Sequence, residues 1–263
     1  MKKGISQLVL PRGKSLKEHL EFARSAGYEG IELSFRIEEL HLDMKESELA
    51  AIREMCLEHG LIPCSACGVS APLTSPDRDE REKGKENVIK LLRCAKALGI
   101  DAVLVVPGRV TESVPYDAAY ESCLRSLMEL APVAEEIKVS IAIENVWNRF
   151  LLSPLEMRML LDTVDSPYVG MYFDVGNVVI FGYPEQWIRI VGSKIRKVHV
   201  KDFRRKGYQW TPLMEGDVDW KAVMTELRAI GYDDFLISEV GGDEEAHRRT
   251  AETMDRIISL RSY

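Results

Sequence analysis

The chain has 263 residues, of which 46% are hydrophobic and 29% charged, and its formal net charge is −7. This length fits one α/β barrel, and the hydrophobic content is enough to bury a core without disulfides. The acidic balance counts against a nucleic-acid partner, because neutralising phosphates needs a basic surface. No run reaches the roughly 18 apolar residues that a membrane span needs, and residues 1–5 lack the apolar run of a signal peptide.

The cysteines are odd in number and scattered, at Cys56, Cys64, Cys67, Cys94 and Cys123. This arrangement predicts reduced thiols in a cytoplasmic protein, not a disulfide framework. Cys64 and Cys67 have C-x-x-C spacing, but they lie along a predicted strand, and no second cysteine or histidine pair stands nearby to complete a zinc site. We therefore expect both thiols to be packing residues.

Short apolar or β-branched runs recur about every 30 residues, which is the periodicity of repeated strand–helix units. Most are apolar on both faces, as strands buried in a parallel sheet should be. In chain order, the predicted strands are 4–8, 30–34, 62–66, 102–106, 139–144, 169–173, 195–200 and 235–239.

Helical segments with recognisable ends lie between these runs. Ser15 and Glu18 have the spacing of a capping box, which begins a helix. Glycines that end helices and prolines that begin them mark the other boundaries. These signals predict a first helix that ends at Gly27, helices at about 46–59 and 81–98 that end at Gly60 and Gly99, and helix starts at Pro154 and Pro184.

Eight strand–helix units can form a closed barrel or a doubly wound open sheet. No glycine-rich phosphate loop follows the first strand, as it would in a nucleotide-binding open sheet, and no linker divides the chain. The sequence therefore predicts a single-domain (β/α)8 TIM barrel that spans residues 1–263.

Four side chains at the ends of the later strands can bind a metal: Glu144, Asp174, His199 and Glu239. The carboxyl ends of barrel strands meet at one face, so these side chains are expected to lie together. Each alone is an ordinary loop or core residue, but three buried carboxylates in one barrel mouth would repel each other strongly without a cation. One histidine with three carboxylates suits one divalent ion, with Mn²⁺ expected first and Mg²⁺, Co²⁺ or Zn²⁺ possible.

More charged residues follow the seventh strand. Lys201 and Asp202 are expected either to polarise a substrate and orient His199, or to form an ordinary salt bridge. Arg204 and Arg205 could clamp a substrate phosphate, although an exposed basic loop explains them equally well.

Several segments together resemble the xylose isomerase-like TIM barrels, the sugar phosphate isomerase/epimerase group. The chain is similar to the L-ribulose/L-xylulose 5-phosphate 3-epimerases and to the D-tagatose 3-epimerase branch over essentially its whole length. The segments that carry this resemblance are 10–13, 30–34, 174–177 (DVGN), 199–202 (HVKD) and 215–220 (EGDVDW).

The resemblance implies that Glu144, Asp174, His199 and Glu239 are the four metal ligands, and that the two glutamates are the catalytic acid/base pair. It places Asn177 where the free-sugar epimerases have a substrate-contacting histidine. Their substrate-binding acid, which follows shortly after the stretch matching 145–150, is also missing here. Both departures count against a free ketose, and they leave phosphorylated or otherwise modified substrates open.

The expected chemistry is proton abstraction next to a carbonyl through an enediolate, which isomerises or epimerises a small sugar or sugar phosphate. A metal-dependent dehydratase or lyase of the inosose dehydratase kind would use the same ligands and stays open. A non-catalytic sugar-binding barrel would usually lack one of the acids. An endonuclease IV-like nuclease would need many histidines, whereas this chain has five, and only His199 ends a strand. A homo-oligomer is possible.

Overall fold

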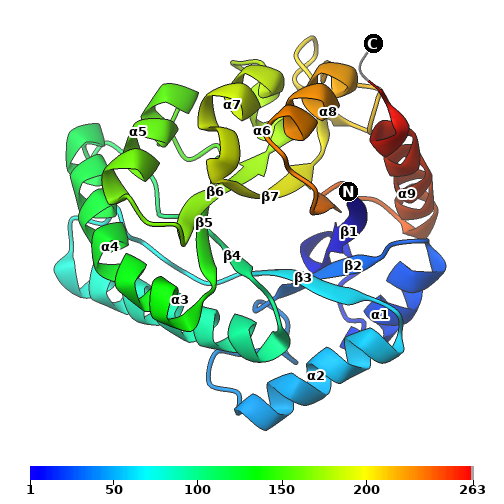
Figure 1. Ribbon diagram of the computed structural model, residues 1–263, viewed down its shortest axis with the longest axis horizontal. Coiled ribbons are helices and arrows are strands. Elements are labelled where there is room, and N and C mark those ends of the chain that lie inside the picture. Colours follow the sequence, from blue (N-terminus) through cyan, green and yellow to red (C-terminus); the bar gives the residue numbers. More distant parts are fainter. Residues whose placement is uncertain (262–263) are drawn as a thin grey trace.

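Eight parallel strands close into a barrel, with helices around the outside (Figure 1). The computed structural model describes residues 1–261, so the last two residues of the domain expected at 1–263 lie outside the described residues. Around the ring the strands follow the order β1-β10-β7-β6-β5-β4-β3-β2. The barrel strands are β1 (Lys2–Ser6), β2 (Gly30–Ser34), β3 (Ile62–Cys67), β4 (Ala102–Val105), β5 (Ser140–Glu144), β6 (Val169–Asp174), β7 (Ile195–Val200) and β10 (Phe235–Ser238).

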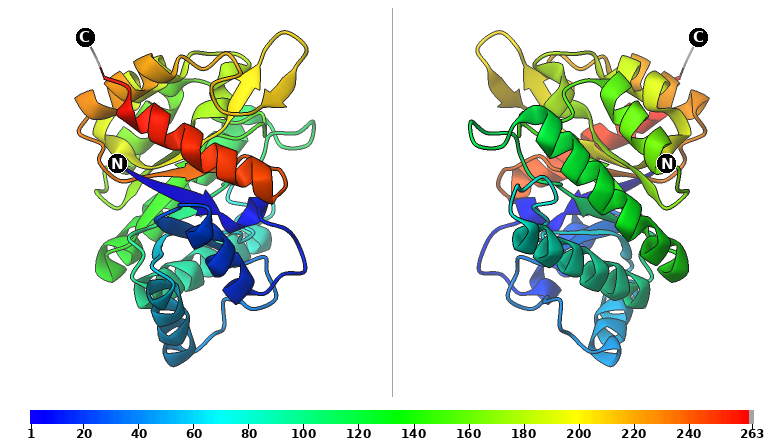
Figure 2. Two further views of the ribbon diagram at one scale, coloured as in Figure 1. Left: turned by 90° about the vertical axis from the view of Figure 1, so that its right-hand side faces the viewer. Right: turned by 90° about the vertical axis from the view of Figure 1, so that its left-hand side faces the viewer.

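All of the described helices except the last lie in the connections between strands, the last follows β10, and several pack against their neighbours around the ring. They are α1 (Leu16–Ser25), α2 (Glu46–Glu58), α3 (Arg78–Leu98), α4 (Tyr116–Ile137), α5 (Pro154–Val164), α6 (Val175–Val179), α7 (Pro184–Val191), α8 (Trp220–Ala229) and α9 (Glu244–Ser259). Within residues 1–261, no helix combines the length and apolar character needed to cross a membrane. Strands β8 (Asp202–Arg204) and β9 (Gln209–Thr211) form an antiparallel hairpin that projects from one end of the barrel (Figure 2).

The predicted barrel is confirmed, and seven of its strands agree with the predicted boundaries to within one residue at each end. The predicted boundaries of the first strand, 4–8, are wrong. The strand runs from Lys2 to Ser6, and a 3-10 turn follows at Gln7–Val9. Gln7 explains the early end, because its buried side chain turns inward to partners on other elements. Its Oε1 accepts a hydrogen bond from Ser34 N at 3.0 Å, and its Nε2 lies 3.1 Å from His19 Nδ1.

Helix α3 begins at Arg78, three residues before the predicted start. Asp77 sets this boundary, because its side chain accepts hydrogen bonds from the backbone N–H groups of Asp79 and Glu80. The capping box at Ser15 and Glu18 is confirmed at the start of α1. The helix starts at Pro154 and Pro184 are confirmed for α5 and α7.

The interior of the barrel contains a small apolar cluster distinct from the main core under the helices. It comprises Cys64, Cys67, Leu104, Ala142, Tyr172, Phe235 and Ile237. The expectation that Cys64 and Cys67 are packing residues is therefore confirmed. Space here is tight, since a Cβ on Gly30 would lie only 2.4 Å from the Phe235 ring.

Candidate metal centre

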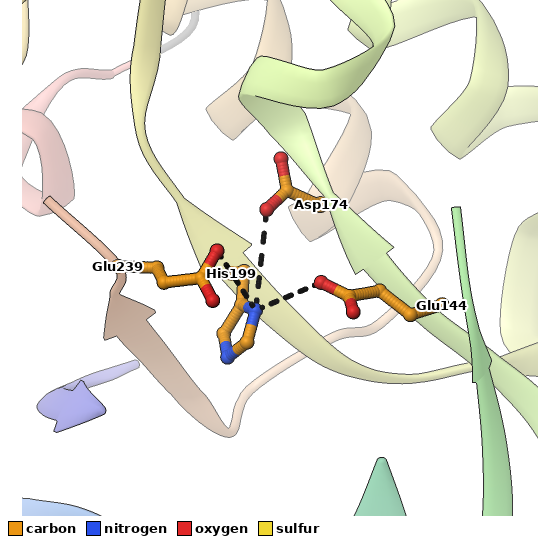
Figure 3. A group of neighbouring side chains, drawn as sticks. All are labelled: Glu144, Asp174, His199 and Glu239. Atoms are coloured by element: carbon orange, nitrogen blue, oxygen red, sulfur yellow. Dashed lines mark hydrogen bonds and ion pairs between the residues drawn. The ribbon is translucent and has the colours of Figure 1, made fainter. Parts of the chain in front are cut away.

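Glu144, Asp174, His199 and Glu239 converge at the carboxyl ends of neighbouring strands (Figure 3). Glu144 ends β5, Asp174 ends β6, His199 lies near the end of β7, and Glu239 follows β10 directly. Nδ1 of His199 lies 3.2 Å from Glu144 Oε1, and 3.9 Å from both Asp174 Oδ2 and Glu239 Oε2. The expectation that the barrel brings these four side chains together is thus met.

Burial makes this group electrostatically unfavourable without a cation. Asp174 and His199 are fully buried, Glu144 is nearly so, and only the Glu239 side chain keeps 20% of its surface exposed. Burial, together with the charges on Glu239 and Asp174, raises the pKa of Glu144 to about 7, against the lowering influence of His199. Burial also raises the pKa of Asp174. A positive ion among these carboxylates would remove both penalties.

The donor atoms fit one divalent ion. One atom from each of the four residues lies within 4.8 Å of all the others, which is close to the roughly 4.4 Å that separates opposite ligands with bonds of about 2.2 Å. Oδ2 of Asp174 is buried and accepts no hydrogen bond from the described residues, although Lys201 Nζ lies 3.0 Å away as an ion pair. A buried carboxylate oxygen without a hydrogen bond is what a metal ligand requires.

Glu32 fixes the orientation of His199, and the sequence analysis missed it. Its Oε1 lies 3.1 Å from His199 Nε2, on the side of the ring opposite the three carboxylates. Glu32 is fully buried and also accepts hydrogen bonds from Ser6 Oγ at 2.6 Å and Tyr172 Oη at 2.5 Å. Burial opposes the charge on Glu32, but His199 and these hydrogen bonds lower its pKa to about 2. An acceptor at Nε2 keeps a hydrogen there and leaves Nδ1 as the metal-binding nitrogen.

Two asparagines brace Asp174. Asn145 Oδ1 accepts a hydrogen bond from Asp174 N at 2.8 Å, and Asn145 Nδ2 donates to Asp174 O at 2.9 Å. Asn177 N donates to Asp174 Oδ1 at 2.7 Å, and Asn177 Nδ2 donates to Asn145 O at 2.9 Å. Asn177, which was expected to bind substrate, therefore lies beside the centre with its backbone N–H holding Asp174.

Lys201 also joins the group, as expected. Its Nζ lies 2.5 Å from Glu239 Oε2 and 3.0 Å from Asp174 Oδ2. Burial opposes the charge on Lys201, but the surrounding carboxylates raise its pKa above the ordinary value. The ammonium group also lies 5.0 Å from the centre of the Trp210 ring. Lys201 therefore remains a cation at the edge of the centre, next to the most exposed of the four side chains.

Asp202 does not reach His199 and instead holds the loop that leads to α8. Its carboxylate accepts hydrogen bonds from Met214 N at 3.0 Å and Trp220 Nε1 at 2.9 Å. A Cβ on Gly216 would lie 2.1 Å from Asp202 Oδ1, so only glycine fits there. Asp202 of the HVKD segment and Trp220 of the EGDVDW segment are therefore joined by a hydrogen bond.

The structure brings neither Arg204 nor Arg205 to the centre. Arg204 donates a hydrogen bond to the carbonyl of Glu215. The Arg205 guanidinium donates to the carbonyls of Val179 at 2.7 Å and Gly182 at 2.8 Å. Both side chains therefore hold loops together.

A hollow of about 850 Å³ opens beside the centre and is lined by Lys201, Trp210 and Glu239. Trp210 stacks on Trp147, with ring centres 5.0 Å apart and planes 19° apart. Because Trp210 belongs to the β8–β9 hairpin and Trp147 follows β5, the two aromatic rings form a wall at the mouth of the barrel. An aromatic wall beside polar groups is typical of a small-molecule site.

Fold and site together define a class: a TIM barrel with a buried, oxygen-rich group of side chains, at the carboxyl ends of its strands, that could hold a cation. The chain belongs to the xylose isomerase-like TIM barrel family, whose sequence pattern matches residues 20–260.

Known proteins support this placement. The chain is 26% identical over 247 residues to L-ribulose-5-phosphate 3-epimerase UlaE of Escherichia coli O157:H7, covering 87% of this chain and 83% of the relative. It shares its fold with D-psicose 3-epimerase with D-tagatose from Clostridium cellulolyticum H10 (TM-score 0.83, 19% identity, 99% of each chain). It also shares its fold with the IOLI protein with a binding zinc atom (TM-score 0.82, 21% identity, 100% of each chain). The epimerases among these relatives are isomerases.

Proposed function

We propose that this protein is a metal-dependent epimerase or isomerase of a small sugar or sugar phosphate, which exchanges a proton on the carbon next to a carbonyl. The observation that carries the proposal is the convergence of four donor atoms, from Glu144, Asp174, His199 and Glu239, within 4.8 Å of one another. The similarity to an L-ribulose-5-phosphate 3-epimerase supports the same reaction class.

One divalent ion would be held by these four residues. One imidazole nitrogen and three carboxylates suit Mn²⁺ best, with Mg²⁺, Co²⁺ or Zn²⁺ as alternatives. When bound, such an ion supplies Lewis-acid stabilisation of negative charge on substrate oxygen atoms.

Glu144 and Glu239 are the proposed acid/base pair. They extend from opposite sides of the centre, since β6 and β7 separate β5 from β10 around the ring. One carboxylate takes the proton from the carbon, and the other returns a proton to the opposite face, which inverts that carbon with no net proton change. Without a bound ion, burial and neighbouring charges raise the pKa of Glu144 to about 7, so binding of the ion would release a proton near neutral pH.

Lys201 is the proposed substrate-binding cation. Its ammonium group lies between Glu239 and the Trp210 ring, on the wall of the hollow of about 850 Å³. From there it can donate hydrogen bonds to a substrate oxygen while it keeps Glu239 in place. Asn177 takes the supporting role of holding Asp174, and Asp202, Arg204 and Arg205 hold the surrounding loops.

The proposed cellular setting is the cytoplasm. All five cysteines are free and buried, as in proteins of reducing compartments. The proposed partner is the small-molecule substrate, and a homo-oligomer stays possible.

Proton exchange from solvent tests the proposal before the natural substrate is known. The protein is incubated with Mn²⁺ in D₂O with a panel of ketoses and ketose phosphates, and deuterium next to the carbonyl is measured by NMR. We expect exchange in at least one substrate, and we expect Glu144→Gln and Glu239→Gln each to slow inversion of that carbon by about 100-fold or more.

The matched control is Glu215→Gln, which removes a carboxylate from the same hollow but not from the centre. Its exchange rate should stay near that of the unmodified protein. Inversion that continues at a normal rate after either substitution in the pair would contradict the two-carboxylate scheme. Loss of one water from the substrate in place of inversion would show a dehydratase on the same centre.

A further inference from the structure

A second hollow, of about 890 Å³, lies at the carboxyl ends of the strands on the side of β2, β4 and β5. Three arginines line it: Arg36, Arg109 and Arg149. They come from three different loops, which follow β2, β4 and β5 respectively. In a chain with a net charge of −7, three guanidinium groups on one hollow form a local concentration of positive charge.

None of the three guanidinium groups has an acidic partner among residues 1–261. The ion pairs of the described residues do not include Arg36, Arg109 or Arg149, and the only hydrogen bond from these side chains runs from Arg36 Nε to Gly68 O at 3.4 Å. A single exposed arginine without a partner is ordinary. Three that line one concave surface, with free guanidinium donors, suit a phosphate or carboxylate group.

Two acids also line this hollow, but both are engaged locally. Asp77 Oδ1 accepts hydrogen bonds from the N–H groups of Asp79 and Glu80, which caps α3. Glu80 Oε2 accepts from Ser75 Oγ at 2.6 Å. Neither forms an ion pair with the three arginines, so the guanidinium groups keep their donors free.

The loops that carry two of these arginines are tied to each other by hydrogen bonds. Asn148 Nδ2 donates to Gly108 O at 2.7 Å, and Val110 N donates to Asn148 O at 3.1 Å. Arg109 N in turn donates to Thr74 Oγ1 at 3.0 Å. These bonds join the segments on either side of the hollow, so the backbone at Arg109 and Arg149 is held in place.

Arg149 itself has a left-handed backbone, with a φ of 61°. This conformation is disfavoured for a residue with a side chain and persists only where neighbouring contacts impose it. Here the bonds of Asn148 to the loop after β4 impose it. This backbone places Arg149 among the residues that line the hollow.

The hollow shares lining residues with a smaller hollow beside the metal centre. Trp147 and Arg149 follow Glu144 by three and five positions, and both also line a neighbouring hollow of about 510 Å³. The wall of that smaller hollow includes Asn145 and Asn177, which hydrogen-bond directly to Asp174. A small substrate at the centre could therefore extend an anionic end towards the three arginines.

We infer that Arg36, Arg109 and Arg149 form the subsite for the phosphate of the substrate, so that the substrate is a sugar phosphate and not a free sugar. This inference rests on the proposed function, which it makes more specific. It also places the phosphate contact away from Arg204 and Arg205, whose guanidinium groups already hold carbonyl oxygens.

The test is a binding comparison that needs no turnover. Ribitol 5-phosphate, ribitol and inorganic phosphate are titrated calorimetrically into the protein as purified; neither polyol has a carbonyl group, so neither can react. We expect ribitol 5-phosphate to bind at least about tenfold more tightly than ribitol, because each charge-assisted arginine contact is worth about that factor. Arg36→Gln, Arg109→Gln and Arg149→Gln should each lose about tenfold, and the triple variant should lose the preference.

Arg204→Gln is the matched control from the basic loop, and it should keep the preference for the phosphate. The inference is overturned if the unmodified protein binds both polyols equally, if the folded triple variant keeps the preference, or if Arg204→Gln removes it. Deuterium exchange into free ribulose at high concentration should survive in the triple variant. If no ketose exchanges but the arginines still select ribitol 5-phosphate, the proposed function fails and the anion subsite stands.

Discussion

Replacing Glu32 by glutamine tests how the protein prepares His199 for a metal ion. The substitution keeps the shape of the side chain but removes a fully buried charge 3.1 Å from His199 Nε2. A hydrogen bond to a charged group contributes about 1.5–3 kcal/mol, and partners behind a metal ligand typically change metal affinity by about 10–100-fold. Glutamine can still accept a weaker bond through its amide oxygen, so we expect the lower end, a loss of about tenfold.

The assay is competition between the metal-stripped protein and a fluorescent chelator for Mn²⁺ at constant pH. A nitrogen-15 NMR spectrum should show in parallel that His199 loses its fixed Nε2–H form. Tyr172→Phe is the matched control, because it removes the 2.5 Å bond to Glu32 Oε2 but not the contact to His199. It should lower the free energy of unfolding by about 1–3 kcal/mol with little change in metal affinity. A folded Glu32→Gln protein that binds Mn²⁺ as tightly as the unmodified protein would refute the reasoning.

Three further predictions concern the centre and its supporting loop. Glu239→Gln should slow inversion of the substrate carbon by about 100-fold or more but change ribitol 5-phosphate binding only slightly, and an equal loss of both would contradict an acid/base role. The pKa of Glu144 is raised to about 7 in the absence of an ion, so protons compete with the metal for this carboxylate. Mn²⁺ affinity should therefore fall as the pH drops below about 7. An affinity that stays constant between about pH 5 and about pH 8 would contradict this prediction. Gly216→Ala should lower the free energy of unfolding by about 1–3 kcal/mol, because its Cβ would lie 2.1 Å from Asp202 Oδ1. Gly241→Ala, with open space around it, is the control, and equal melting temperatures for the two variants would count against the steric argument.

The fold and the four converging side chains could be predicted because both follow from local patterns. Buried parallel strands appear as apolar runs, and the barrel places their carboxyl ends together. The sequence therefore predicted Glu144, Asp174, His199 and Glu239 as one group without any coordinates. The first strand was misplaced because the polar side chain of Gln7 finds buried partners on other elements, which no local pattern reveals.

Glu32 was missed although it carried a signal. A carboxylate in the middle of the buried segment 30–34 is unusual, because an acid is almost never fully buried without a partner. Its partners, Tyr172 and His199, come from the opposite side of the barrel, more than 100 residues away in the chain. The anomaly was visible in the sequence, but the identity of the partners depended on barrel closure.

The arginines show the opposite error. Arg204 and Arg205 attracted attention because they are adjacent in the sequence, yet their guanidinium groups bind carbonyl oxygens of nearby loops. Arg36, Arg109 and Arg149 stand alone in three loops, so no motif marks them, and only the folded chain places them around one hollow. A cluster of basic residues in the sequence is thus a poor guide to where basic side chains gather on the folded surface.

The central claim is that one divalent ion binds between Glu144, Asp174, His199 and Glu239. The most direct test is a crystal structure of the protein with Mn²⁺, with diffraction data collected at the manganese absorption edge. We predict a single strong anomalous peak at the carboxyl ends of β5, β6, β7 and β10, within bonding distance of Nδ1 of His199 and one oxygen of each acid. Full exposure to Mn²⁺ with no peak there, or a peak that these side chains do not contact, would contradict the account.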